Sequence, residues 1–258
     1  MSQRLQCFLD GVSLDSLDES IRLLDVREQP VLRLTTARRA EGGGSVLTDA
    51  ARTALEVTIS FGLYERSVLR RAALLEKVAD WATGRTLTCT ARPGRMLRVR
   101  CSGLPAMRSH LNWTEPLSLT LTAWAVPWWQ DERPARIRQD SEETPEVEWY
   151  VPGTAPETPV SCRVTNLSDE TLTELTLGCG ETRAALDGLL LSAGDTVDLC
   201  VDADGMLSIL DGSGGSVAKW RTADSDDLLL ARCGARNTLR VEADTRVSAL
   251  WQARGRYL

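Results

Sequence analysis

The chain has 258 residues, of which 43% are hydrophobic and 26% charged, and a formal net charge of −6. This composition is close to the average of globular proteins and excludes global disorder. Lysine and arginine exceed acidic residues by 20 to 16 over residues 1–140, whereas acidic residues exceed them by 20 to 10 over residues 141–258. The length and this change in charge predict two domains. The acidic second half disfavours sequence-specific binding of DNA.

Membrane insertion and secretion are not indicated. The longest apolar stretch runs from Ala123 to Trp129 and contains Pro127, far short of the about 20 apolar residues that a membrane-spanning helix needs. The first ten residues contain no apolar h-region. We therefore expect no membrane span, no secretory signal and synthesis in the cytoplasm.

In the first half, a single segment has the apolar period of a helix, from Ser67 to Thr83. Gly84 follows it and predicts a left-handed helix end. Segments 31–36, 54–61, 85–102 and 117–126 alternate or carry β-branched residues, and we expect them to be strands. The first half is thus predicted to be strands around one helix, whose apolar stripe consists of Val68, Ala72, Leu74, Leu75, Val78, Ala79, Trp81 and Ala82.

Residues 85–102 predict a hairpin that turns at Pro93-Gly94. A two-residue loop would place arginine on the core face, so we predict a three-residue loop, which pairs Leu87 with Cys101 and Cys89 with Val99. This register gives one apolar face and one face of threonine and arginine. It does not favour a disulfide between Cys89 and Cys101.

The segment from 131 to 160 holds five prolines and many acidic residues, and we expect it to be a linker with a boundary near residue 145, in which 147–151 can form one short strand. The predicted domains are 1–140 and 160–258, joined by a linker at 141–159.

In the second domain, short alternating runs are separated by Asp-Gly turns at 187, 204 and 211. This pattern is typical of a β-sandwich.

The residue inventory leaves little room for catalysis. His110 is the only histidine, and no two of the seven cysteines form a C-x-x-C motif, so neither a zinc knuckle nor a disulfide framework is indicated. We interpret the cysteines as small buried hydrophobic residues. The chain has no nucleophile elbow, no complete dinucleotide or phosphate-binding glycine motif and no EF-hand spacing. We predict no catalytic residue, no cofactor and no metal site.

Two groups of residues are candidates for surface contacts. Arginine is favoured at interfaces because its planar guanidinium pairs with carboxylates, and the predicted hairpin carries the candidate subunit-interface residues Arg92, Arg95, Arg98 and Arg100. Eight tryptophans suggest an exposed aromatic surface that stacks on sugar rings. Its candidates are Trp128, Trp129 and Trp149, although packing in a core or an interface is the favoured interpretation of these residues.

The order of the elements resembles a known family. An N-terminal Phe8-Leu9-Asp10-Gly11-Val12 precedes a helix ending in Trp81-x-x-Gly84, then Pro93-Gly94-Arg95, a strand ending in Gly103, and a strand closing on Ala125-Val126-Pro127-Trp128. The second half adds four short matches: Val164-Thr165-Asn166, residues 201–205, Arg236-Asn237-Thr238-Leu239 and residues 254–258. Together these resemble the distal tail protein (Dit) family of long-tailed, non-contractile bacteriophages.

The resemblance implies a mainly β fold. The N-terminal domain would be a tail-tube-like β-sandwich or barrel with one α-helix and a β-hairpin, and the C-terminal domain a galectin-like β-sandwich. It also implies a structural virion protein at the tail tip, without enzymatic activity. Six copies would form a ring, alone or as two rings back to back, whose central channel lets the phage DNA pass. The ring would join the tail tube protein to a tail-tip or tail-associated lysin protein, and in some relatives it carries receptor-binding proteins.

Two other classes of function remain open at this stage. A carbohydrate-binding protein would use Trp149, Trp220 or Trp251 as a platform, and an enzyme acting on cell-wall glycan would need a carboxylate pair that no motif singles out. If the threonine and arginine face of the hairpin lies between subunits, replacing Arg98 and Arg100 by glutamate weakens ring assembly.

Overall fold

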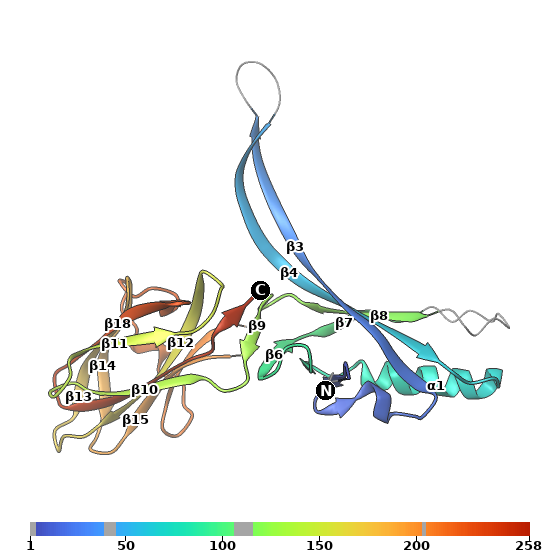
Figure 1. The fold of residues 1–258 in the computed structure, drawn as a ribbon. Helices are drawn as coiled ribbons and strands as arrows, with labels where there is room; N and C mark the ends of the chain where they lie inside the picture. Colours follow the sequence, from blue (N-terminus) through green and yellow to red (C-terminus); the bar gives the residue numbers. More distant parts are fainter. Residues whose placement is uncertain (1–3, 39–44, 106–115, 203–204) are drawn as a thin grey trace. The chain divides into compact units, whose positions relative to one another are not determined.

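The chain folds into two compact units, Met1–Trp129 and Gln130–Leu258. The computed structural model describes residues 4–38, 45–105, 116–202 and 205–258. Over these residues the fold is mainly β, with one α-helix and four antiparallel sheets (Figure 1), which confirms the predicted fold class. No helix in the described ranges has the length and hydropathy needed to cross a membrane.

The helix α1 (Val68–Trp81) forms where the apolar period predicts it. Ser67 caps its N-terminus, because the Ser67 Oγ accepts a hydrogen bond from the Arg70 amide at 3.4 Å. Four residues of the predicted stripe are buried, namely Leu74, Val78, Trp81 and Ala82. Val68 at the start of the stripe is 52% exposed. The stripe is therefore only half covered within the first unit.

Gly84 ends the helix for a different reason from the one predicted. Its φ is not positive, and the chain leaves the helix through a tight turn in which the Gly84 amide donates to the Trp81 carbonyl at 3.1 Å. A Cβ at this position would lie 2.9 Å from the Cβ of Leu9. Gly84 is thus required by the close approach of the N-terminal strand.

The first unit contains two sheets. One sheet consists of short strands, is here called the small sheet, and has the order β2-β1-β5-β6-β9; the other contains the two long strands and has the order β3-β4-β8-β7. A 3-10 turn, Leu14–Ser16, lies between β2 and β3. The strands are β1 (Cys7–Leu9), β2 (Val12–Ser13), β3 (Ile21–Arg38), β4 (Ser45–Leu63), β5 (Thr86–Cys89), β6 (Arg95–Arg98), β7 (Arg100–Gly103), β8 (Leu117–Ala123) and β9 (Trp129–Asp131).

The strands β3 and β4 are much longer than the predicted segments 31–36 and 54–61. They pair along their whole length, from Ile21 with Leu63 to Arg38 with Ser45. The neighbouring β8 pairs with β4 only over residues 55–61. Residues 32–38 and 45–53 therefore form a two-stranded ribbon, here called the arm, which projects from the first unit (Figure 1).

Three β-bulges interrupt the long β3–β4 ladder. The register shifts between Leu23 and Asp25, between Val31 and Leu32, and between Thr35 and Thr36. A bulge bends its strand and increases the local twist. The bulges explain the curvature of β3 and β4 in Figure 1.

The hairpin after the helix has a different register from the predicted one. Leu87 pairs with Leu97, and Thr86 with Arg98, instead of Leu87 with Cys101. The connection consists of two successive turns, because the Arg92 amide donates to the Cys89 carbonyl at 3.0 Å and the Arg95 amide to the Arg92 carbonyl at 3.2 Å. The shift is an even number of residues, so the apolar and polar faces keep their predicted members.

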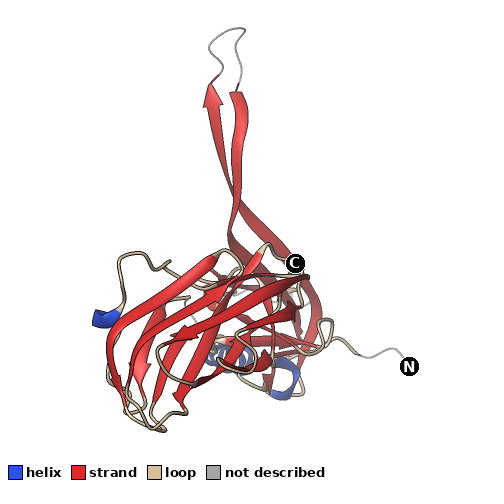
Figure 2. Cartoon of the chain, turned by 90° about the vertical axis from the view of Figure 1, so that its left-hand side faces the viewer, coloured by secondary structure: helices blue, strands red, loops and turns tan. Residues whose placement is uncertain are grey.

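The second unit is a sandwich of two sheets that enclose one core (Figure 2). The sheets have the orders β10-β19-β12-β15-β16 and β11-β18-β13-β14, with β17 paired to β12. The predicted β-sandwich is confirmed. The strands are β10 (Ala135–Asp140), β11 (Glu146–Val151), β12 (Glu157–Asn166), β13 (Leu172–Cys179), β14 (Thr182–Leu191), β15 (Thr196–Val201), β16 (Leu207–Asp211), β17 (Leu230–Arg232), β18 (Ala235–Ala243), β19 (Val247–Ala253) and β20 (Arg256–Tyr257), with a 3-10 turn at Ala218–Trp220.

The segment 141–159, predicted as a linker between domains ending at 140 and starting at 160, is part of this sandwich. The division between the units falls at Trp129 and Gln130, and residues 146–151 form β11. The acidic residues of the segment are cross-strand partners rather than marks of a solvated linker. Glu146 binds Arg240 at 2.7 Å, and Glu148 binds Arg236 at 3.3 Å.

One buried amide joins the two sheets of the sandwich. Gln139 of β10 is 1% exposed. Its Nε2 donates to the carbonyls of Thr144 and Pro145 at 2.8 Å, and to that of Leu239 in β18 at 3.4 Å. Its Oε1 accepts from the Trp251 Nε1 at 2.9 Å. Gln139 thus satisfies donors and acceptors of both sheets inside the core.

Candidate interaction surfaces

No group of three metal-ligating side chains comes together in the described residues. Four cysteines are buried, as predicted, and three are half-buried, namely Cys101, Cys200 and Cys233. Burial raises the pKa of Cys179 to about 12, which makes its thiol a poor nucleophile. His110 and the glycines 42–44 lie outside the described residues.

The four candidate arginines differ in exposure and in the elements that carry them. Arg98 and Arg100 are exposed, but they lie on β6 and β7, which belong to different sheets. Arg98 donates to the Thr86 Oγ1 at 3.0 Å. Arg95 is half-buried at the start of β6. Arg92 lies at the tip of the hairpin, and its guanidinium is engaged inside the first unit.

Arg92 belongs to a cluster at the base of the arm. Its guanidinium forms a bidentate pair with Glu28 of β3, with distances of 3.2 and 2.7 Å, and lies 5.9 Å from the ring centroid of Trp129. The Trp129 Nε1 also donates to Glu28, at 3.1 Å. Arg52 of β4 lies 4.3 Å from the ring centroid of Trp128. These five residues, the arm-base cluster, connect β3 and β4 to the hairpin and to the end of the first unit.

Replacing Glu28 by glutamine is expected to destabilise the first unit by about 2 kcal/mol, because the partly buried Arg92 guanidinium loses its carboxylate. Urea unfolding of the full chain, combined with amide exchange in β3 and β4, measures the loss. The control is Glu76→Gln, at an exposed position of α1, with an expected change within about 0.5 kcal/mol. Equal effects of the two variants would contradict the structural role of Glu28.

The predicted aromatic surface is wrong for two of its three residues. Trp129 is 0% exposed and Trp149 5% exposed. Trp128 is half-buried under Arg52. Trp149 and Trp251, two of the three platforms of a carbohydrate-binding protein, lie in the core of the sandwich. Both are at inward positions of alternating strands, where burial of the indole dominates.

The arm carries apolar side chains that the sequence did not mark as a surface. Leu32 is 56% and Leu34 59% exposed. Leu34 pairs with the exposed Ala50 of β4, so these three side chains lie on the same side of the ribbon. We call them the arm face. The sequence predicted a strand over residues 31–36. It did not indicate that, among the described residues, β3 is the only strand that pairs with residues 45–54 of β4.

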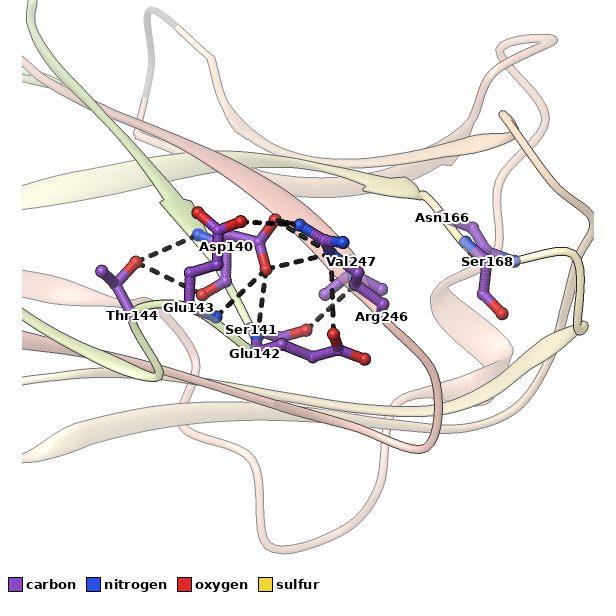
Figure 3. A network of polar contacts seen from close by, with 9 residues as sticks. All are labelled: Asp140, Ser141, Glu142, Glu143, Thr144, Asn166, Ser168, Arg246 and Val247. Atoms are coloured by element: carbon purple, nitrogen blue, oxygen red, sulfur yellow. Dashed lines mark hydrogen bonds and ion pairs between the residues drawn. The ribbon is translucent and has the colours of Figure 1, made fainter.

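A network of charges lies at one end of the sandwich (Figure 3). Arg246 binds Asp140 through its Nη2 at 2.9 Å and Glu143 at 3.0 Å, and its Nε lies 3.8 Å from Glu142. The Asp140 Oδ1 also accepts from the Glu142 amide at 3.0 Å. The hydrogen bonds from Arg246 hold the pKa of Asp140 below its ordinary value. The network fixes the turn between β10 and β11 against β19.

The turn that follows β12 is fixed in a similar way. Asn166 is 1% exposed, and its Nδ2 donates to the carbonyls of Glu170 and Leu191 at 2.7 and 2.9 Å. Its Oδ1 accepts from the Ser168 amide at 2.9 Å (Figure 3). These hydrogen bonds of the Asn166 side chain close the turn and stabilise the sandwich, so its Nδ2 and Oδ1 are both engaged within the protein.

Lowering the pH below the ordinary carboxyl pKa of 3.8 is expected to remove the stabilisation that Asp140 provides. A folded-state pKa below the unfolded one gives stability that is fully present above the unfolded pKa and is lost as the pH falls through the folded pKa. Thermal unfolding of wild type and Asp140→Asn over a pH series measures this. The two should differ near neutral pH and converge in acid, and a difference independent of pH would contradict the assignment.

Comparison with known proteins gives similarity at the level of structure. No protein-family model matches the sequence, and no curated protein matches it. The fold is similar to that of the Dit protein of phage SPP1, with a TM-score of 0.72, 13% identity, and coverage of 98% of this chain and 99% of that chain. That protein is described as a paradigm of the hub adsorption apparatus in phages that infect Gram-positive bacteria.

A second solved structure covers the chain to the same extent. It is the baseplate of phage P2 in its activated conformation with calcium, with a TM-score of 0.50, 11% identity and coverage of 98% of both chains. Both likenesses cover 98% of this chain and therefore extend over both units. This chain therefore has the fold of the SPP1 Dit protein, as the resemblance seen in its sequence implied.

Proposed function

We propose that this chain is a structural hub protein at the tip of a phage tail and has no enzymatic activity. The observation that carries the proposal is the likeness to the SPP1 Dit protein over 98% of the chain. The described residues add consistent features, because polar clusters in both units are engaged in structural contacts. Fold alone does not determine function, so the proposal needs a test of assembly.

In this proposal six copies form a ring, and the arm makes contacts between neighbouring subunits. A two-stranded ribbon is marginally stable in water by itself, and the arm face exposes Leu32 and Leu34. Among the described residues, no third strand pairs with the arm, because β3 is the outer strand of its sheet and β8 pairs with β4 only over residues 55–61. A neighbouring subunit that covers the arm face would bury these side chains and stabilise the ribbon.

Arg98 and Arg100 remain candidates for the same interface. Both are exposed, and neither forms an ion pair among the described residues. Arg92 serves the fold of the first unit through Glu28, so we leave it out of the interface. Arg95 is half-buried and stays a candidate for the ring contacts, and the half-buried Trp128 stays a candidate for an aromatic surface.

The ring would lie in the virion between the tail tube protein and a tail-tip or tail-associated lysin protein. DNA would pass through its channel without sequence-specific contacts, and the second unit would be available for receptor-binding proteins. The excess of acidic over basic residues in residues 141–258, 20 against 10, fits a domain kept away from the DNA.

The mass of the purified full-length chain in solution tests the proposal. Light scattering after size exclusion should give six times the 28.3 kDa chain mass, about 170 kDa, or twice that for two rings back to back. Negative-stain images of that peak should show annular particles. A monomer at every concentration, together with absence of the chain from purified virions, would overturn the proposal.

A further inference from the structure

Two thiols face each other in the small sheet of the first unit. Cys7 on β1 and Cys89 on β5 are directly opposite each other in the antiparallel register. Their sulfur atoms are 3.7 Å apart, and the two residues are 1% and 6% exposed. The residues are 82 positions apart in the chain, so the contact depends on the fold. Cys89 was predicted to pair with Val99 across the hairpin, whereas Cys7 lies on β1 at the other edge of β5, a pairing that nothing in the sequence indicated.

The hydrogen-bond ladder places the two cysteines at a site that accepts a disulfide. On one side of the pair, the Thr90 amide donates to the Gln6 carbonyl at 3.0 Å, and on the other side the Asp10 amide donates to the Thr86 carbonyl at 2.9 Å. Hydrogen-bonded and non-hydrogen-bonded pairs alternate along an antiparallel ladder, so Cys7 and Cys89 form a non-hydrogen-bonded pair. Such pairs have Cα atoms about 4.5 Å apart, within the range that a disulfide spans.

We propose that Cys7 and Cys89 are an oxidation site. Exchange with a small-molecule disulfide such as oxidised glutathione joins their two sulfur atoms in a disulfide. The thiols would stay reduced in a bacterial cytoplasm and become linked in an oxidising medium. This proposal is independent of the proposed function, because it concerns the first unit of a single chain.

The exchange balances in two steps. The Cys89 thiolate attacks one sulfur of the small disulfide, forms a mixed disulfide and releases one thiolate. Cys7 then loses its proton to that thiolate, and its sulfur attacks the Cys89 sulfur and releases the second thiolate, which takes a proton from water. Two protein thiols are oxidised to one disulfide, and one small disulfide is reduced to two thiols.

The contact between the sulfurs also decides which thiol attacks first. The Cys7 S–H donates to the Cys89 sulfur. This hydrogen bond lowers the pKa of Cys89 to about 7 and raises that of Cys7. A larger thiolate fraction at Cys89 favours it as the attacking group. Because β1 has three residues and its outer neighbour β2 two, local opening of this edge gives the small disulfide access.

No other pair of cysteines in the described ranges has sulfurs within hydrogen-bonding distance. Burial raises the pKa of Cys162 well above its ordinary value, and that of Cys179 to about 12. These thiols are protonated near neutral pH and react slowly. Among the described residues, a disulfide within the chain is therefore expected at the Cys7–Cys89 pair.

The test is refolding of the full chain in a buffer of reduced and oxidised glutathione, followed by alkylation of free thiols and peptide mass mapping. We expect a Cys7–Cys89 link and five of the seven thiols still free. The same equilibrium measured in urea gives the unfolded reference, and the native chain should favour the link by at least about tenfold. The linked protein should unfold about 10 °C higher, because the link closes a long loop.

Two variants control the experiment. Cys7→Ala should leave Cys89 reduced or bound to glutathione, with no protein disulfide. Cys101→Ala removes a half-buried cysteine outside the pair and should form the Cys7–Cys89 link as wild type does. Absence of the link, equal linkage in native and urea-unfolded chains, or a linked protein that unfolds at a lower temperature would overturn the proposal.

Discussion

Replacing Trp251 by alanine is expected to lower the free energy of unfolding of the second unit by about 4 kcal/mol. Trp251 is 0% exposed on β19, which lies between β10 and β12 in the sheet. Its removal leaves a large cavity in the core and leaves the Gln139 Oε1 without the Trp251 Nε1 as donor. Urea unfolding of the full chain, followed by amide exchange in β12 and β19, measures the loss in this unit.

Two matched variants separate the cavity from the hydrogen bond. Trp251→Phe keeps most of the packing and removes the N–H group, with an expected loss of about 1–2 kcal/mol. Trp220→Ala removes a half-buried indole whose ring centroid lies 3.8 Å from the Lys219 Nζ. The free energy of unfolding is expected to fall by less than about 1 kcal/mol. If Trp220→Ala were as damaging as Trp251→Ala, the core position of Trp251 would not be the cause.

If the proposed ring forms through the arm, replacing Leu32 and Leu34 together by glutamate is expected to convert it into monomers. Each leucine of the arm face that enters a subunit contact contributes about 2 kcal/mol, so the double variant should weaken each contact about a thousandfold. Both side chains are more than half exposed in the single chain, at 56% and 59%. The monomer should therefore keep its stability within about 0.5 kcal/mol. Light scattering gives the mass, and urea unfolding gives the stability.

The control for this experiment is an equally exposed leucine elsewhere. Leu190 of β14 is 75% exposed and belongs to the second unit. Leu190→Glu should keep the mass of the ring. An unchanged ring after Leu32→Glu with Leu34→Glu would exclude the arm face from the subunit contact and leave Arg98 and Arg100 as the interface to test next.

Local patterns predicted the elements that local forces determine. The helix begins at a Ser67 cap and ends before Gly84 as its apolar period indicated, and the alternation in the second half produced a sandwich with Trp251 inside. The sequence patterns did not predict which strands pair when they lie far apart in the chain. The Cys89 partner on β1 is 82 positions away, and nothing in residues 85–102 distinguishes one loop from two successive turns.

Acidic residues and prolines are common both in solvated linkers and in paired edge strands, so composition alone did not distinguish these two structures. The acidic residues around Pro145 looked like a solvated linker, yet Glu146 and Glu148 pair with Arg240 and Arg236 on the next strand. The same ambiguity affected the candidate surfaces. Arg92 looked like an interface residue, and its bidentate partner Glu28 is 64 positions earlier in the chain. A carboxylate that far away leaves no trace in the spacing around Arg92.

The bulges of β3 and β4 bear on how an unassembled chain avoids aggregation. A free edge of a long, flat ribbon is a template on which other chains add as strands. The register shifts at Leu23/Asp25, Val31/Leu32 and Thr35/Thr36 divide the ladder into short segments. One of these segments, residues 32–35, carries the two leucines of the arm face. A foreign strand finds no long regular edge to extend, so the arm can expose its leucines in a single chain with less risk of forming fibres.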